Sequence, residues 1–200
     1  ATAARVLAAI TVAATLRFGV TGARSPLRKL DLRGADVEAG FAVAPVLSPD
    51  GGRIAYLSKN RIWVRDLDQL APRAVADVTS STPVGWSHDA RTIVYADGKK
   101  LWKVPAEGGG PTAICEIPGT GSILGASWSP SGKIAFSVWR GGMYRVAAGG
   151  GTAELLIDID PATTVDFHSP SWLPNGDLIY DTHWKSQQEG KRQASTNLTV

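Results

Sequence analysis

Cysteine and histidine are scarce in this 200-residue sequence, which limits the sites that it can form. Cys115 is the only cysteine, so neither an intrachain disulfide nor a cysteine-based zinc site is possible. There are three histidines, and charged residues make up 20% of the chain, an ordinary share for a folded domain. The length suffices for one globular domain with a real core.

A basic surface on the main part of the chain is also missing. Residues 1–34 hold six basic residues and one acidic residue, so this arm carries +5 while the whole chain carries +3. The remaining residues therefore sum to −2. Nucleic-acid binding would need a basic face on the folded body, so we expect no nucleic-acid partner.

The N-terminal apolar run is shorter than a membrane span. Val6–Leu16 holds eleven uncharged residues between two arginines, whereas a spanning helix needs about 20. Three interpretations stay open: the end of a transmembrane helix, the core of a signal peptide, or an ordinary amphipathic or buried segment. Residues 1–20 are thus an apolar segment, and residues 21–40 are a linker or a strand leading into the next region.

Motifs for phosphate binding and serine hydrolysis are absent. The glycine runs 108–110 and 149–151 precede no Gly-Lys-Ser/Thr, and Gly119-Thr120-Gly121 lacks the third glycine of a dinucleotide loop. No Gly-x-Ser-x-Gly elbow occurs. We interpret the glycines as turns and expect no cofactor and no metal.

What the sequence does contain is a repeat. LSPDGGRIAY at Leu47–Tyr56 returns as WSHDARTIVY from Trp86, WSPSGKIAF from Trp128 and WLPNGDLIY from Trp172. The third position of each motif falls at residues 49, 88, 130 and 174, at intervals of 39, 42 and 44. A period of this size is typical of the blades of a β-propeller.

Each copy predicts strands separated by turns. Proline and glycine in Pro-Asp-Gly and its variants favour a turn, and the apolar residues that follow favour a strand buried on both faces. An aromatic residue recurs in the next strand of three copies, at Trp63, Trp102 and Tyr144, each 12 residues after the turn position at residue 51, 90 or 132. In the fourth copy a polar insertion delays this strand to NLTV, at Asn197–Val200. The motif tryptophans are expected to pack between neighbouring sheets.

These features predict an all-β fold, a β-propeller of four-stranded blades. The four repeats cover about residues 41–79, 80–118, 119–161 and 162–200. The phrases LSPDGGRIAY and RIWVRDLD resemble the Pro-Asp repeats of TolB-like, WD-repeat-like propellers. Those propellers usually have six blades, so the resemblance implies that the propeller is incomplete at its C-terminal end. Such an open edge is expected to promote aggregation of residues 41–200 alone.

A narrower resemblance concerns the sensor region of bacterial membrane-anchored serine/threonine kinases. The phrases RIAYLSKNRIWVRDLDQL, KLWKVPAEGGGPTAIC and FSVWRGGMYRVAAGGG are typical of that group, in which a kinase domain and one transmembrane helix precede the propeller. The kinase motifs themselves are missing, and Asp166-Phe167-His168 is not the magnesium-binding Asp-Phe-Gly.

Three residues are candidates for ligand binding: Asp166, His168 and Trp139. A Ser-His-Asp triad could be drawn from Asp166, His168 and Ser169 or Ser171, but residues so close on a strand are expected to diverge. His88 holds a turn position and is expected to be exposed. Asp158 and Asp160 beside Asp166 lack the glycine and glutamate of a calcium loop, and are interpreted as an exposed acidic loop.

The resemblance implies a recognition domain that is not itself an enzyme. It would be the extracytoplasmic sensor of a membrane-anchored kinase-like receptor, binding a protein, peptide or small ligand at the propeller face. One alternative is the substrate-gating propeller of a prolyl oligopeptidase-class hydrolase. Another is a free periplasmic TolB-like protein, and a third arrangement places a winged-helix DNA-binding domain upstream.

Overall fold

A computed structural model describes residues 44–80, 82–185 and 196–199. The segments predicted at residues 1–20 and 21–40 lie outside the described residues. No helix among the described residues is long and apolar enough to cross a membrane. The regular elements described in this part of the chain are strands. They are β1 (Val46–Leu47), β2 (Arg53–Ser58), β3 (Arg61–Asp66), β4 (Arg73–Asp77), β5 (Val84–Trp86), β6 (Thr92–Asp97), β7 (Lys100–Pro105), β8 (Thr112–Glu116), β9 (Ile123–Trp128), β10 (Lys133–Val138), β11 (Met143–Ala147), β12 (Glu154–Ile157), β13 (Thr164–Trp172), β14 (Asp177–Trp184) and β15 (Thr196–Thr199).

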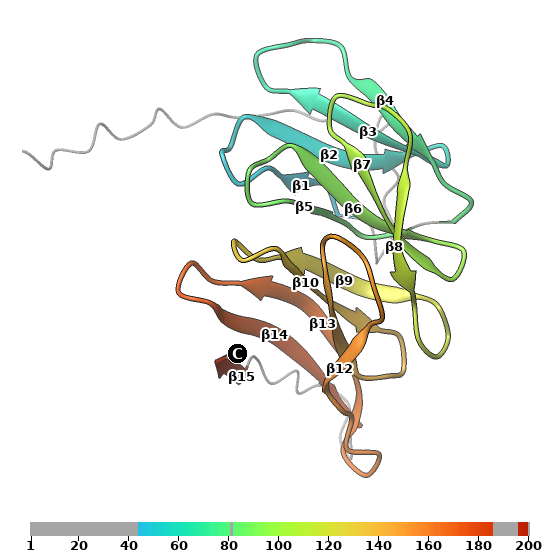
Figure 1. Cartoon of the computed structure of the whole chain (residues 1–200), viewed down its shortest axis with the longest axis vertical. Coiled ribbons are helices and arrows are strands. Elements are labelled where there is room, and N and C mark those ends of the chain that lie inside the picture. The colour runs from blue at the N-terminus through green and yellow to red at the C-terminus, as the bar shows by residue number, and fades with distance from the viewer. Residues whose placement is uncertain (1–43, 81, 186–195, 200) are drawn as a thin grey trace, which may run out of the picture. The chain divides into compact units, whose positions relative to one another are not determined.

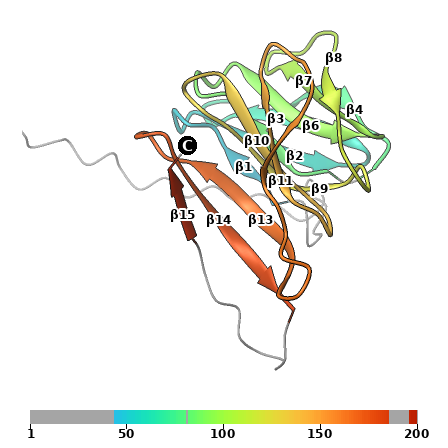
Figure 2. The ribbon, with the colours of Figure 1, turned by 60° about the horizontal axis from the view of Figure 1, so that its bottom comes forward.

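The strands form four antiparallel sheets in chain order, as Figure 1 shows. Strands β1–β4, β5–β8 and β9–β12 make four-stranded sheets, and β13–β15 make a three-stranded one. This arrangement confirms the predicted series of four blade units. The late strand predicted in the fourth copy is also confirmed, because β15 pairs with β14 (Figure 2).

Each sheet shares a hydrophobic core with the next sheet along the chain. One core joins buried residues of β2–β4 with β5–β7, a second joins β6–β8 with β9–β11, and a third joins β10 and β11 with β13 and β14. The apolar second strands are buried on both faces in the first three sheets, as predicted. The core is therefore a set of inter-sheet layers, which is how propeller blades bury apolar surface.

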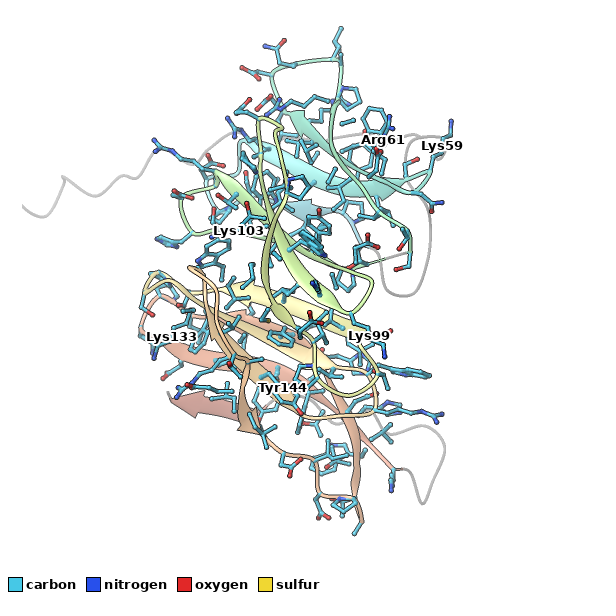
Figure 3. The ribbon with its side chains drawn as sticks, turned by 45° about the vertical axis from the view of Figure 1, so that its right-hand side comes forward. Lys59, Arg61, Lys99, Lys103, Lys133 and Tyr144 are labelled. Atoms are coloured by element: carbon cyan, nitrogen blue, oxygen red, sulfur yellow. The ribbon has the colours of Figure 1, made fainter. Side chains whose placement is uncertain are left out.

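The motif tryptophans lie in these layers, which confirms the prediction that they pack between sheets. Trp86 is buried in the first layer, and its indole N–H donates a 3.0 Å hydrogen bond to the carbonyl of Val46 in the preceding sheet. Trp128 and Trp172 pack against the second and third layers. Lys103 adds a polar link, because its ammonium donates to the carbonyl of Ala148 over 2.6 Å (Figure 3).

The turn after each first strand is fixed by a small polar network. In the first copy, the Ser48 hydroxyl donates to Asp50 over 2.5 Å, and the same carboxylate accepts the N–H of Gly52. The Ser48 oxygen also accepts the N–H of Arg53. Ser87 and Asp89 repeat this arrangement in the second copy.

The carboxylates of these turns have a pKa below the ordinary value. For Asp50 the main cause is the hydrogen bond from Ser48, and for Asp89 it is the bond from Ser87. The backbone in the turn has positive φ, +68° at Gly51 and +79° at Gly132. Ala90 holds the same position in the second copy at +57°, a conformation that costs a residue with a Cβ about 1–2 kcal/mol.

Candidate functional site

The first strands of all four sheets come together around one hollow. β1, β5, β9 and β13 and the turns that follow them line a cavity of about 470 Å³, which we term the inner-strand groove. Small-molecule and peptide sites are usually clefts of about 300–1,000 Å³. The groove is thus large enough for a ligand, and it is built from equivalent positions of the repeat.

Glycine allows the inner strands to approach closely. A Cβ on Gly85 of β5 would lie 2.7 Å from the carbonyl oxygen of Ala126 in β9. A Cβ on Gly125 of β9 would lie 2.8 Å from Pro170 and 3.2 Å from the backbone of Ser169 in β13. Contacts below 3.0 Å force a shift, so any larger residue would push neighbouring first strands apart.

The wall of the groove is aromatic and proline-rich. The tryptophans and prolines that line it are Trp86, Trp128, Trp172, Pro49, Pro130, Pro170 and Pro174. Leu47 is 55% exposed at the edge, and His88 is exposed in its turn, as predicted. The backbone N–H of Trp172 donates to the Ser127 hydroxyl over 3.0 Å, which ties the fourth first strand to the third.

A second cluster lies at the opposite end of β13. The carboxylate oxygen Oδ1 of Asp166 lies 3.0 Å from Nε2 of His168 and 3.0 Å from Nδ1 of His183. The side chain of Asp166 is buried, that of His168 is 28% exposed and that of His183 is 56% exposed. Two imidazoles therefore meet one buried carboxylate close to the solvent.

The strand pairing explains how the cluster forms. Asp166 and His168 are two residues apart on β13, so their side chains lie on the same face. Asp166 is paired with His183 of the antiparallel strand β14, and such directly opposed side chains are neighbours. One register shift precedes Asp166 and another follows His168, and bulges of this kind re-aim side chains.

The preceding sheet holds the carboxylate from its other side. The backbone N–H of Arg140, in the turn between β10 and β11, donates to Oδ2 of Asp166 over 3.1 Å. The Arg140 guanidinium lies 5.0 Å from the ring centre of Trp139, which is 45% exposed. Arg140 itself has a φ of +54°.

The three candidates from the sequence thus lie in one neighbourhood. Asp166 and His168 are in contact, and Trp139 is adjacent in sequence to Arg140, the residue that holds Asp166. The expectation that Asp166 and His168 diverge is wrong, because residues two apart on a strand share a face. Sequence reasoning missed His183, which reaches the cluster only through the pairing of β13 with β14.

Asp158 and Asp160 do not join this cluster and instead hold the loop before β13. Oδ1 of Asp158 accepts the N–H of Ile159, and the carboxylate of Asp160 accepts the N–H of Ala162 and the hydroxyl of Thr163. These bonds lower the pKa of Asp160. The only group of three or more potential metal ligands within the described residues is Asp166, His168 and His183.

Comparisons with known proteins identify the fold. No protein-family model matches the sequence, and no curated protein does either. Among solved structures, a TolB-type protein from Agrobacterium tumefaciens is similar at a TM-score of 0.58 and 22% identity, over 74% of this chain and 57% of that one. The fold is a β-propeller. The chain spans about half the length of the solved propellers that it matches, as this one illustrates.

Enzymes are also among the similar propellers. A gluconolactonase from Xanthomonas campestris matches at a TM-score of 0.60 and 12% identity, over 79% of this chain and 58% of that one. An oligogalacturonate lyase from Vibrio parahaemolyticus matches at 0.52 and 15%, over 72% of this chain and 47% of that one.

These enzymes contradict the expectation from sequence that the chain is not an enzyme. The propeller fold carries both TolB proteins and enzymes, because the chemistry of a propeller depends on its site and not on its blades. The fold alone therefore does not decide whether this chain binds a partner or catalyses a reaction.

Proposed function

We propose that this chain is a TolB-like recognition propeller that binds an extended, apolar or proline-containing segment of a protein in the inner-strand groove. The supporting observation is the composition of that groove. Three tryptophans and several prolines from equivalent repeat positions face one cavity of about 470 Å³. Aromatic-lined grooves suit extended, proline-rich peptides, because such peptides are already stiff and lose little entropy on binding.

The edge of the groove supplies a second supporting feature. Leu47 is 55% exposed on β1, although leucine is usually buried. Its exposed position beside the tryptophans and prolines provides apolar surface that a bound segment would cover. The first strands are fixed by close backbone contacts at Gly85 and Gly125, so the groove is largely preformed and ordering costs on binding are small.

Binding is tested by titrating the whole chain with a ten-residue proline-rich peptide and with a Gly/Ser peptide of equal length. Tryptophan fluorescence is the readout, because three indoles line the groove. We expect saturable binding of the proline-rich peptide only. Leu47→Asp should weaken it about tenfold or more, since a charge would be desolvated in the complex.

Leu70→Asp is the matched control, because Leu70 is 90% exposed and does not line the groove. Its affinity should equal that of the unchanged protein. Equal losses in both variants, or no difference between the two peptides, would refute recognition at the groove.

A more specific proposal concerns the cellular compartment of the propeller and its attachment to a membrane. The resemblance of the sequence to kinase sensor regions supports an extracytoplasmic, periplasmic domain anchored through the segment that precedes residue 21. The propeller would then present its groove to a ligand outside the cytoplasm. A free periplasmic TolB-like protein is the alternative with the same groove and no anchor.

Sequencing the genomic locus outward from both ends separates these settings. A kinase domain and a complete transmembrane helix before residue 1, with further blades after residue 200, are expected for the receptor. A signal peptide directly upstream would favour the free periplasmic protein. A Gly-x-Ser-x-Gly motif downstream would favour the hydrolase arrangement instead.

A further inference from the structure

The structure assigns a second site to the cluster at the start of β13: we propose that Asp166, His168 and His183 bind a divalent transition-metal ion, with Zn²⁺ the best match. Two imidazole nitrogens and one carboxylate oxygen are ligands that zinc accepts readily. Magnesium and calcium prefer all-oxygen sites, so this set disfavours them. Sequence analysis predicted no metal, and this proposal departs from it because strand pairing adds His183 to Asp166 and His168.

The spacing of the three ligand atoms suits one small ion. Both imidazole nitrogens lie 3.0 Å from the same carboxylate oxygen, and all three atoms lie within 4.8 Å of one another. Zinc bonds of about 2.0–2.2 Å in a tetrahedral arrangement place ligand atoms roughly 3.3–3.5 Å apart. Each imidazole nitrogen would have to move a few tenths of an ångström away from the carboxylate oxygen, and the two nitrogens, which lie within 4.8 Å of each other, would have to reach the same spacing by rotation of the His183 or His168 side chain.

The backbone already holds these side chains in place. Asp166 is buried, and its second oxygen is held by the Arg140 N–H at 3.1 Å. A ligating carboxylate in a metal site is commonly fixed by such an outer hydrogen bond. His168 and His183 come from two hydrogen-bonded strands, so the geometry does not depend on a loop.

One side of the cluster remains open. His183 is 56% exposed and His168 is 28% exposed, whereas the carboxylate is closed off behind them. Three protein ligands with an open side leave a coordination position for water or for an anionic group of a ligand, as in zinc sites that are not purely structural. The site lies at the opposite end of β13 from the groove, so it does not depend on the proposed peptide binding.

A purely structural role makes a different prediction. In that case the two imidazoles hydrogen-bond to Asp166 and fasten β13 to β14 without any ion. Removing His183 would then lower stability by the same amount with or without zinc. A metal site requires instead that zinc stabilise the protein and that this stabilisation vanish when a ligand is lost.

The test uses the full 200-residue chain, without an affinity tag and stripped of metal by a chelator. Zn²⁺ binding is measured by calorimetry, and Co²⁺ is added separately because its visible absorption reports four-coordinate nitrogen and oxygen ligands. We expect one ion per chain, a rise in the melting temperature with Zn²⁺ and no rise with Mg²⁺. His183→Ala and Asp166→Asn should each lower the Zn²⁺ affinity by about 100-fold or more, beyond the 10–100-fold typical of lost outer contacts.

His88→Ala is the matched control, because His88 is an exposed histidine at the groove. It should bind Zn²⁺ like the unchanged chain. His183 is largely exposed, so its variant is expected to fold, and circular dichroism checks this. Absence of Zn²⁺ binding, or binding that survives His183→Ala and Asp166→Asn, overturns the proposal.

Discussion

The sheet of β9–β12 and the sheet of β13–β15 derive from the same repeat but bury their second strands differently. In β10 the residues Ile134, Ala135 and Phe136 are completely buried, since sheets lie against both faces. In β14 the burial alternates: Leu178 and Tyr180 are buried and Ile179 between them is only partly so. The continuous apolar run of β14 predicted burial on both faces, and for Ile179 that prediction is wrong.

The difference shows that the burial of a strand residue in this fold depends on whether a neighbouring sheet covers the face on which it lies. Leu178 and Tyr180 pack in the layer shared with the third sheet, and Phe167 of their own sheet meets the Tyr180 ring edge-on at 5.3 Å. Ile179 points to the other face, which no sheet of the described residues covers. His183 lies on this same face, near the end of β14. Because no described sheet covers the face there, the Asp166 cluster is accessible to solvent.

The largest expected effect separates the two second strands directly. Ile134→Ala should lower the free energy of unfolding by about 2–5 kcal/mol, because it removes a fully buried side chain and leaves a cavity. Ile179→Ala should cost about 1 kcal/mol or less, because solvent already reaches that position. Urea unfolding curves measure both, and equal losses would contradict the comparison.

The contact between first strands gives the next effect. Gly85→Ala places a methyl group 2.7 Å from a backbone oxygen of the neighbouring sheet, and should cost about 1–3 kcal/mol through forced displacement. Gly125→Ala would place its methyl group against β13. Within the described part of the chain, the sheet of β13 packs against another sheet on one side only, so it can yield and the loss of stability should be smaller. Thermal unfolding of the two variants ranks them. A larger loss for Gly125→Ala would mean that the fourth sheet is held as firmly as the third.

Substitutions in the turns of the repeat should change stability by smaller amounts. Ala90→Gly should raise stability by up to about 1 kcal/mol, because glycine adopts the observed φ of +57° without strain. The gain is reduced by the loss of a buried methyl group. Gly132→Ala is the converse change at an open position, and should lower stability by about 1 kcal/mol. Melting temperatures that move in the same direction would contradict this account.

The smallest expected effect is the loss of stability at acidic pH. Hydrogen bonds from serine lower the pKa of Asp50 and Asp89 in the folded state, so these turns add stability above the ordinary carboxyl pKa. That contribution is lost as the pH falls from about 4 through the lowered values. Ser87→Ala should return the pKa of Asp89 toward its ordinary value, as followed by NMR titration, and should leave Asp50 unchanged.

The fourth turn is the natural control for this acid effect. It has Leu173 in place of the serine and Asn175 in place of the aspartate, and the Asn175 amide oxygen accepts the N–H of Asp177 over 3.1 Å. An amide does not titrate, so this bond persists in acid. A chemical shift of Asn175 that followed the Asp89 titration would argue against independent turns.

Much of the architecture could be predicted because its signals are local. The serine-to-glycine turns, the apolar second strands and the tryptophans recur at one period, and each follows from backbone preference or from the need to bury apolar surface. The groove was harder to foresee. Its lining residues are motif residues, but the cavity exists only where four first strands meet.

The sequence by itself determined the repeat, the order of the strands and the inter-sheet layers, since these follow from turn and apolar patterns that recur in every copy. Tertiary structure alone decided which polar residues meet. Asp166 and His183 are 17 residues apart and become neighbours through strand register. Arg140 reaches the same carboxylate from another sheet, because packing between sheets sets that contact and no local pattern encodes it.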